Sequence, residues 1–291
     1  MIFRHSAFLH DVLTERARGQ LLAVYRRSLY VAVRARSTEH VAAVVDASLG
    51  NGPLSLVARH LLHPPVAAGD PVILEDGCLR IGPVSFPVTG SEPWDPVIRI
   101  HSTDLVPEAV EGCRDLVVRE APPHSLAALL PALRDDGVAD LEPWQRNALR
   151  HARQLMQGAS TGSLGKVRKG AMGLVGLGPG LTPSGDDFLC GFLLGLFIAG
   201  ERRPIRVILD AAKATHRISR AYVWAAARGG AAEVWHRLLF ALCTARGWQQ
   251  ATRAILRTGE TSGADALTGF LAWWATPARR PRTGRRPPPR P

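Results

Sequence analysis

The sequence predicts an α+β protein in which a β-rich N-terminal domain precedes a mainly helical C-terminal domain. From Leu21 to about Thr89, large apolar and β-branched residues alternate with polar or small ones, the period of half-buried strands. From Pro143 onward, Ala, Leu and Trp recur at helical spacing. Prolines interrupt the stretch between these two patterns, so the change of period marks a change of domain.

Four segments follow from these patterns and from composition. We expect a β-rich domain over residues 1–120, a small barrel or sandwich, then a transitional linker over 121–142. A helical domain over 143–276 and a disordered tail over 277–291 complete the chain. The tail holds six arginines and no acidic residue, and without it the net charge of +11 falls to +5. Its Arg- and Pro-rich composition cannot bury apolar surface, so disorder is expected there.

Within the first domain, the stretch Pro71–Ile81 predicts a hairpin that turns at Glu75-Asp76-Gly77. Another strand is expected over Trp94–Ile100. In the linker, Asp135-Asp136-Gly137 predicts a turn.

The second domain is expected to begin with a helix at Pro143. The stretch Gly158–Gly170 (GASTGSLGKVRKG) is interpreted as a flexible polar link, and it lacks the spacing of a phosphate-binding P-loop. Its basic residues, Lys166, Arg168 and Lys169, could neutralise a bound anion. Further helices are expected over Phe188–Ala199, Ile205–Arg228, Ala231–Arg246, Trp248–Arg257 and Asp265–Ala275.

The most informative stretch is Gly176–Gly191, which reads GLGPGLTPSGDDFLCG. Its glycines allow positive φ and close approach to a ligand, while two prolines stiffen the loop. Ser184 followed by Asp187 resembles a capping box at the start of the next helix. Because unpaired N–H groups and the helix dipole favour negative charge there, the stretch predicts an anion site. The alternative is an ordinary buried turn in which the aspartates only cap the helix.

A second stretch repeats the pattern near the end of the chain. Gly259–Phe270 reads GETSGADALTGF and aligns with Gly180–Phe192 when one residue is skipped at Pro183. Asp187 then lies opposite Asp265, and the pairs Gly191/Gly269 and Phe192/Phe270 also coincide. We therefore hypothesise that two similar helix starts face each other across one site.

The candidate catalytic residues are the carboxylates of these stretches, with Asp187 first, then Asp186 and Asp265. Because carboxylates repel a bare phosphate, they must cap backbone groups, hold an amide NH₂ or hold a cation. Thr215 and Ser219 are expected to share a helix face that adds hydroxyls to a polar pocket. The candidate substrate-binding residues are Gly178, Gly180, Thr182, Ser184, Gly185, Thr215, Ser219, Thr261, Ser262 and Gly263.

The loop GLGPGLTPSGDDFLCG resembles the signature of a bacterial family that includes the third subunit of oxamate carbamoyltransferase, from anaerobic allantoin breakdown. The similarity is densest at Gly176–Gly191. It continues more weakly through Thr215…Ser219, Thr261…Asp265 and HSAF at His5–Phe8. The resemblance implies a role in carbamoyl transfer, or in binding a related small carboxylate, within a multi-subunit enzyme of purine degradation.

Carbamoyl transfer from carbamoyl phosphate needs a phosphate grip and stabilisation of charge on the carbonyl oxygen. The backbone donors of Gly178–Gly185 could supply both, and a carboxylate could orient the amide nitrogen of oxamate for attack. Two alternatives stay open: a non-catalytic ligand-binding or scaffolding subunit, and a metal-dependent hydrolase that uses Asp186, Asp187 and Asp265. No cofactor is expected, although Mg²⁺ is a cation that these aspartates could hold.

Several classes of function are not favoured. The basic charge is concentrated in the tail, and the body lacks a nucleic-acid-binding signature, so no specific nucleic-acid partner is expected. The apolar run Phe188–Ala199 is too short to span a membrane. Four isolated cysteines and the absence of a signal peptide favour the cytoplasm. The resemblance implies a small carboxylate or carbamoyl phosphate, and other enzyme subunits, as partners.

Overall fold

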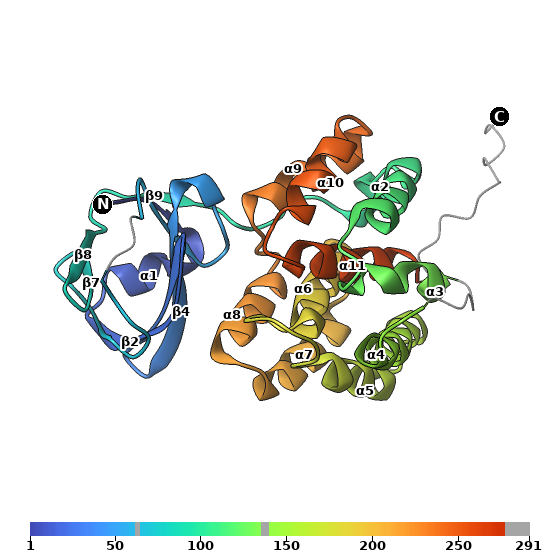
Figure 1. Ribbon diagram of the computed structural model, residues 1–291, viewed down its shortest axis with the longest axis horizontal. Helices are drawn as coiled ribbons and strands as arrows, with labels where there is room; N and C mark the ends of the chain where they lie inside the picture. The colour runs from blue at the N-terminus through green and yellow to red at the C-terminus, as the bar shows by residue number, and fades with distance from the viewer. Residues whose placement is uncertain (62–64, 135–139, 277–291) are drawn as a thin grey trace, which may run out of the picture. The chain divides into compact units, whose positions relative to one another are not determined.

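A computed structural model describes residues 1–61, 65–134 and 140–276 and divides the chain into two compact units (Figure 1). One unit contains residues 1–100 and 213–240, and the other contains residues 101–212 and the chain from 241 onward. The predicted turn at Asp135–Gly137 and the predicted tail over 277–291 lie outside the described residues.

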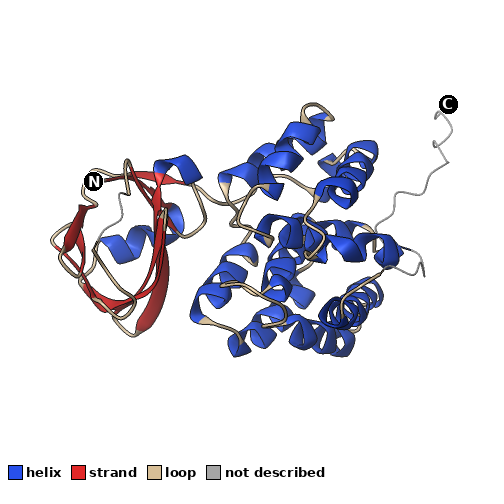
Figure 2. Cartoon of the chain, viewed as in Figure 1, coloured by secondary structure: helices blue, strands red, loops and turns tan. Residues whose placement is uncertain are grey.

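The first unit is built on a nine-stranded sheet that curls into a half-barrel, drawn in red in Figure 2. Its strand order is β8-β7-β6-β2-β3-β4-β5-β1-β9. This sheet and the helices of the second unit confirm the predicted fold class. The strands are β1 Ile2–Ser6, β2 Ala17–Tyr25, β3 Ser28–Ala35, β4 Thr38–Asp46, β5 Ser55–Ala58, β6 Pro71–Glu75, β7 Cys78–Ile81, β8 Val84–Pro87 and β9 Glu92–Trp94.

Alternating side chains give this sheet two apolar faces. Leu29, Val31 and Val33 of β3 belong to a large buried cluster on one face. On the other face, Ala32 packs in a smaller cluster with Ile218 of helix α8 (Arg217–Ala226). The two faces therefore follow from the period of two that the sequence shows.

The predicted hairpin between β6 and β7 is confirmed, because Asp76 and Gly77 form the turn with φ of 49° and 69°. The strand predicted over Trp94–Ile100 is wrong. Strand β9 ends at Trp94, and beyond it Val97 makes only an isolated bridge to Gly230. Proline has no N–H to donate to a ladder, and Pro96 stands in the middle of the predicted strand.

The second unit is helical, and no helix among the described residues has the length and hydropathy needed to cross a bilayer. One helix, α9, continues from the first unit into the second. Helix α9 covers Glu233–Thr244. The first unit also contains α1 His10–Leu13 and α8. The second unit contains α2 Pro107–Glu120, α3 Leu130–Arg134, α4 Pro143–Thr161, α5 Leu164–Leu174, α6 Ser184–Ile198, α7 Arg202–Ala211, α10 Trp248–Leu256 and α11 Ser262–Trp274.

The polar link expected over Gly158–Gly170 is in fact helical. Helix α4 runs on to Thr161, where Gly162 ends it with a φ of 71°, and α5 begins at Leu164. A Cβ on Gly170 would lie 2.5 Å from the backbone nitrogen of Leu155, so this glycine permits close helix packing. The glycines of this stretch suggested flexibility from the sequence, but here Gly170 allows two helices to pack closely.

The helix expected over Ile205–Arg228 is interrupted. Helix α7 ends at Ala211, a 3-10 turn covers Ala212–Ala214, and α8 starts only at Arg217. Thr215 therefore precedes α8, whereas Ser219 lies on it, and the prediction that the two share a helix face is wrong.

Candidate functional site

The site predicted from the two glycine stretches lies where α6 and α11 cross in the second unit (Figure 1). A Cβ on Gly191 would lie 1.7 Å from the carbonyl oxygen of Ala266. A Cβ on Gly269 would lie 1.9 Å from the carbonyl oxygen of Phe188. The two helices therefore touch through their backbones, and each contact is the counterpart of the other in the sequence alignment.

The segments that lead into these helices are also equivalent. The Gly185 N–H donates to the Leu177 carbonyl at 2.8 Å, and the Gly263 N–H donates to the Thr258 carbonyl at 3.0 Å. Both glycines approach the end of the preceding helix so closely that a Cβ would overlap its backbone. The α5–α6 and α10–α11 hairpins thus share one local structure and are related as in a twofold pair.

The two aspartates exchange hydroxyl partners across this pair. Asp187 accepts a hydrogen bond from Thr182 of its own loop at 3.0 Å and another from Ser262 of the other hairpin. Asp265 is influenced in the same way by Thr261 of its own loop and Ser184 of the other. The hypothesis that two helix starts face each other thus describes the observed arrangement.

The surroundings of the two carboxyl groups differ. Asp265 has no exposed surface, and the backbone N–H of Leu126 donates to its Oδ1 at 2.6 Å. Leu126 begins a 3-10 turn, Leu126–Leu129, whose preceding residue Ser125 is held by the Gln145 side chain at 2.9 Å. Asp187, by contrast, is partly exposed, as are Thr182 and Ser262 beside it. Asp265 is therefore fully enclosed, whereas Asp187 is largely buried and retains some exposed surface.

Burial raises the pKa of both aspartates. The pKa of Asp187 lies well above its usual value because of burial, despite the hydroxyls of Ser262 and Thr182, and the charges of Asp265 and Asp186 raise it further. Burial raises the pKa of Asp265 to about 6, although the Leu126 N–H and neighbouring hydroxyls oppose this change. Both carboxyl groups therefore hold a proton to higher pH than an exposed aspartate does.

Two buried polar atoms between the helix starts have no hydrogen-bond partner of normal geometry. They are Ser184 Oγ and Asp265 Oδ2, and both residues have no exposed surface. The prediction that Ser184 caps α6 is therefore wrong, since Pro183 occupies the N-cap position and no side chain caps the helix. The Ser184 hydroxyl nevertheless lowers the pKa of Asp265, so the two groups are close neighbours.

Asp186 has a different role from its neighbour. It accepts the backbone N–H of Gly176 at 3.0 Å and so fixes the start of the glycine loop. The loop takes positive φ at Gly176, Gly178 and Gly180. The N–H of Gly185 is already used within the loop. An anion grip must therefore draw on Gly178, Gly180 and the hydroxyls rather than on every donor in the predicted range.

The remaining predicted residues belong to other elements of the chain. Thr215 and Ser219 belong to the sheet unit, whereas the loop belongs to the helical unit. In the HSAF motif, Ser6 Oγ accepts the N–H of Phe8, and His5 contacts Ser91 and His10. These contacts are all within the sheet unit. Lys166, Arg168 and Lys169 lie on α5.

The described part of the chain contains no group of three or more His, Cys, Asp or Glu residues arranged to hold a metal ion. Asp186 accepts the Gly176 N–H through Oδ1, so one of its two oxygens is engaged by the loop backbone. Oxygen donors of the kind that Mg²⁺ prefers are present at Asp187, Asp265 and the four hydroxyls.

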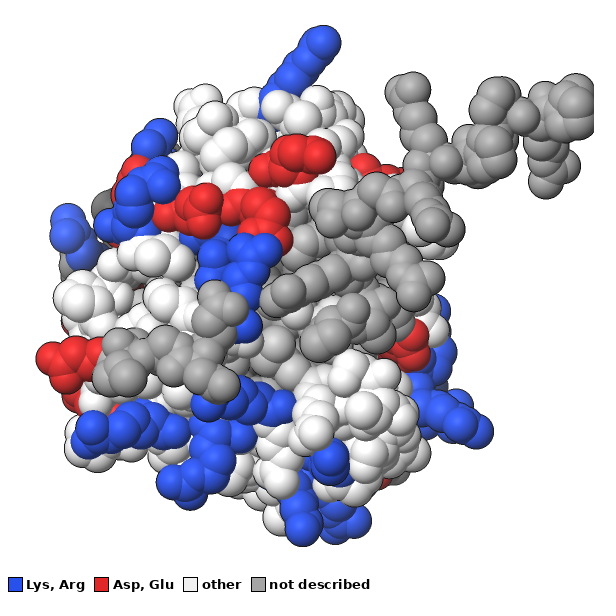
Figure 3. Space-filling view, turned by 90° about the vertical axis from the view of Figure 1, so that its right-hand side faces the viewer, with Lys and Arg blue, Asp and Glu red and all other residues white. Residues whose placement is uncertain are grey.

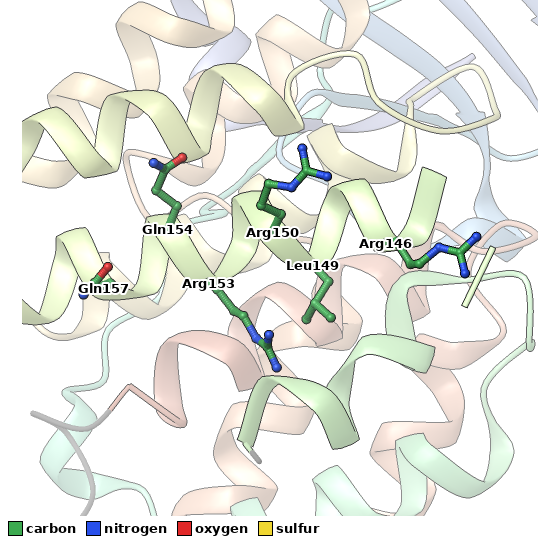
Figure 4. Close-up of a pocket in the computed structure, with 6 residues that line it drawn as sticks. All are labelled: Arg146, Leu149, Arg150, Arg153, Gln154 and Gln157. Carbon is green, nitrogen blue, oxygen red and sulfur yellow. The ribbon is translucent and has the colours of Figure 1, made fainter. Parts of the chain in front are cut away.

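A separate surface hollow of about 630 Å³ lies along α4 (Figure 4). Its lining side chains all project from this one helix, and Arg153 donates to the Ala132 carbonyl. On the face drawn in Figure 3, the described basic and acidic side chains are interspersed. The residues that line the hollow are Arg146, Leu149, Arg150, Arg153, Gln154 and Gln157.

Sequence reasoning missed the turn that seals Asp265. Leu126 contributes a backbone N–H, which no residue type signals, from a stretch that prolines made irregular. Trp144 was also missed as a loop contact: a Cβ on Gly178 would lie 3.1 Å from its ring. The spacing of Ser125 and Gln145, which lie 20 residues apart, gave no warning of their contact.

Comparison with known proteins supports the resemblance noted in the glycine loop. No solved structure matches the chain. Residues 174–273 match the model of a family described as oxamate carbamoyltransferase subunit AllH, and this range contains the glycine loop, α6 and nearly all of α11. Over these residues the chain is similar to the oxamate carbamoyltransferase subunit AllH family.

Proposed function

We propose that the chain is a subunit of a carbamoyltransferase-related enzyme and that it binds a small carboxylate or carbamoyl phosphate at the start of α6. The family match supports the subunit role. The binding site is proposed from one observation, the pairing of the partly exposed Asp187 with hydroxyls from two hairpins. Thr182 Oγ1 lies 3.0 Å from Asp187 Oδ2 and 3.3 Å from Ser262 Oγ.

The electrostatics of this pair remove an objection to anion binding. Two charged aspartates would repel a carboxylate or phosphate. Because burial raises the pKa of Asp187, an uncharged carboxyl group is favoured there, and it can donate a hydrogen bond to an anion. Together with the positive end of the α6 dipole, this makes the opening suitable for a small anion.

Ligand-dependent thermal unfolding of the full chain tests this proposal. Oxamate, oxalurate, carbamoyl phosphate and inorganic phosphate are each added to the wild type and to the double variant Thr182→Val/Ser262→Ala. A ligand present at 100 times its Kd stabilises the native state by about 2.7 kcal/mol, so a rise in Tm of several degrees is expected. The double variant should lose most of this rise.

A matched control changes the same residue types away from the site. Ser160 and Thr161 end α4 and donate only to the Gln157 carbonyl, so Ser160→Ala/Thr161→Val should keep the full response. If no compound in the panel raises Tm in the wild type, the proposed site is wrong. A response without turnover by the assembled enzyme would favour the ligand-binding subunit over a catalytic one.

A further inference from the structure

A chain of hydrogen bonds in the sheet unit links a serine to two histidines that the proposed function does not use. Ser91 Oγ lies 2.8 Å from His5 Nδ1, and His5 Nε2 lies 3.1 Å from His10 Nδ1. His5 is only 4% exposed, whereas His10 is exposed and Ser91 keeps part of its surface accessible. A buried ring therefore connects a partly accessible hydroxyl group to an imidazole at the surface.

Local backbone structure holds these three residues in place. His5 lies on β1, which pairs in parallel with β9, the strand that starts directly after Ser91. Ser91 closes a turn in which its N–H donates to the Val88 carbonyl at 3.1 Å and Gly90 takes a φ of 78°. His10 begins α1, directly after a 3-10 turn. The arrangement thus depends on regular elements of the sheet unit rather than on freely rotating side chains.

The two imidazole rings meet edge to edge, as in an N–H···N hydrogen bond. The planes of the His5 and His10 rings differ by 17°, and their centroids are 5.3 Å apart. This separation is nearly the N···N distance plus the radii of the two rings, so the facing nitrogens lie on the line between the centroids. Two nitrogens that held one metal ion between them in this way would be about 4 Å apart. The contact therefore has the geometry of a hydrogen bond rather than that of half a metal site.

The placement of protons along this chain leaves one nitrogen free to act as a base. When both rings carry their proton on Nε2, His5 donates to His10 Nδ1, and its own Nδ1 accepts the Ser91 hydroxyl. Burial and the neighbouring His10 lower the pKa of His5, so the uncharged ring is favoured at neutral pH. His5 Nδ1 is then available to take the Ser91 proton, and its Nε2–H keeps the contact with His10 when it does.

A surface hollow of about 480 Å³ gives access to this chain of hydrogen bonds, a volume typical of sites for small molecules. His5, His10 and Ser91 all line it. Gly90 adds space beside Ser91, because no atom lies within 4 Å of the position that its Cβ would take. Arg16 also lines the hollow and carries N–H donors suited to the negative charge that develops on a carbonyl oxygen under attack.

We propose that Ser91 is a nucleophile activated by His5, and that the hollow takes a small acyl ester. Ser91 Oγ forms a bond to the acyl carbon, its proton passes to His5 Nδ1, and this proton moves to the alkoxide as the ester C–O bond breaks. Water then attacks the acyl-serine with His5 again as the base, which releases the carboxylic acid and restores the hydroxyl group. The net reaction is ester hydrolysis, and it does not depend on the anion site proposed at α6.

Reaction of the full chain with p-nitrophenyl acetate tests this inference. Peptide mapping by mass spectrometry should find an acetyl group on Ser91, and p-nitrophenol should be released as the acetyl-serine forms. Ser91→Ala should lower the rate of release at least tenfold. His5→Asn should also lower it at least tenfold, because the Asn amide can accept the Ser91 hydrogen bond but cannot take its proton.

Ser85→Ala is the matched control, since Ser85 is an exposed serine on β8 of the same unit, and it should keep the wild-type rate within twofold. Acetylation of His10 or of other surface residues, with Ser91 unmodified, would overturn the inference. A rate that survives in Ser91→Ala would do the same. Mapping of the wild type needs no variant, so it decides even if His5→Asn does not fold. The ligands that test the α6 site are different compounds, so the two proposals fail separately.

Discussion

The α5–α6 and α10–α11 hairpins have the same local structure but present their aspartates to different surroundings. Asp265 is sealed by the turn that starts at Leu126, and Asp187 is left partly exposed. The loop before α6 (Val175–Pro183) is longer than its counterpart before α11 (Arg257–Thr261). The two hairpins therefore share one local structure. They differ in that the Leu126 turn covers Asp265, whereas Asp187 keeps some exposed surface.

This comparison explains why both aspartates survive in a buried setting. An unpaired charge in the interior is costly, and each carboxyl group here is offset by hydroxyls from both hairpins. The sealed copy holds the two hairpins and the Leu126 turn together. Asp187 has the same hydroxyl partners but no counterpart of the Leu126 N–H among the described residues.

The largest expected effect comes from breaking the helix crossing. Gly191→Ala and Gly269→Ala should each destabilise the chain by about 3 kcal/mol or more, because the new methyl group overlaps a backbone carbonyl. Twofold equivalence predicts similar losses for the two variants, measured by urea unfolding. Gly165→Ala, where no atom lies within 4 Å of the added Cβ, should change stability by less than about 1 kcal/mol. A tolerated alanine at either crossing position would contradict the proposed backbone contact.

A smaller effect concerns the sealed aspartate. Its pKa is raised to about 6 in the folded chain, so the native state binds the proton more tightly than the unfolded chain does. The stability contributed by this proton is fully present below about pH 4 and is lost as pH rises through 6. The wild type should therefore lose about 2 kcal/mol relative to Asp265→Asn between pH 4 and pH 7, measured by urea unfolding. Parallel pH profiles for the two proteins would show that Asp265 titrates normally.

The smallest effects should separate the two copies most cleanly. Thr261→Val removes a hydroxyl beside Asp265, which has no exposed surface, and should cost about 1–2 kcal/mol. Thr182→Val removes the equivalent hydroxyl beside the open Asp187, where water can take its place, and should cost less than about 1 kcal/mol. Thermal unfolding at pH 7 compares them. Equal losses would mean that the two aspartates are equally shielded from solvent.

Much of the arrangement could be predicted from local patterns. The strand period, the hairpin at Asp76-Gly77 and the alignment of Asp187 with Asp265 all depend on neighbours in sequence. Glycine was harder to interpret, because the same residue gives flexibility in a loop and contact in a helix. At Gly170 the partner backbone at Leu155 decides between them, and that partner comes from a different helix.

The sealing of Asp265 could not be predicted, for a related reason. Its partner is a main-chain group of Leu126, 139 residues away, and every residue except proline carries the same group. The assignment of Thr215 and Ser219 to the sheet unit likewise depends on long-range packing of α8 against the sheet. The residue types indicated which side chains form the candidate site. Tertiary contacts determined that Asp265 is covered and that Asp187 keeps some exposed surface.

The direct backbone contact at Gly191 and Gly269 has a consequence for how this chain tolerates sequence change. Where helices meet through side chains, compensating substitutions can preserve their spacing, and many sequences become acceptable. Here no side chain intervenes, so the distance between the two helix starts is set by main-chain atoms alone. In a saturation library of the helical unit, almost every substitution at these two glycines should therefore be rejected. Core positions such as Leu193 should accept other apolar residues.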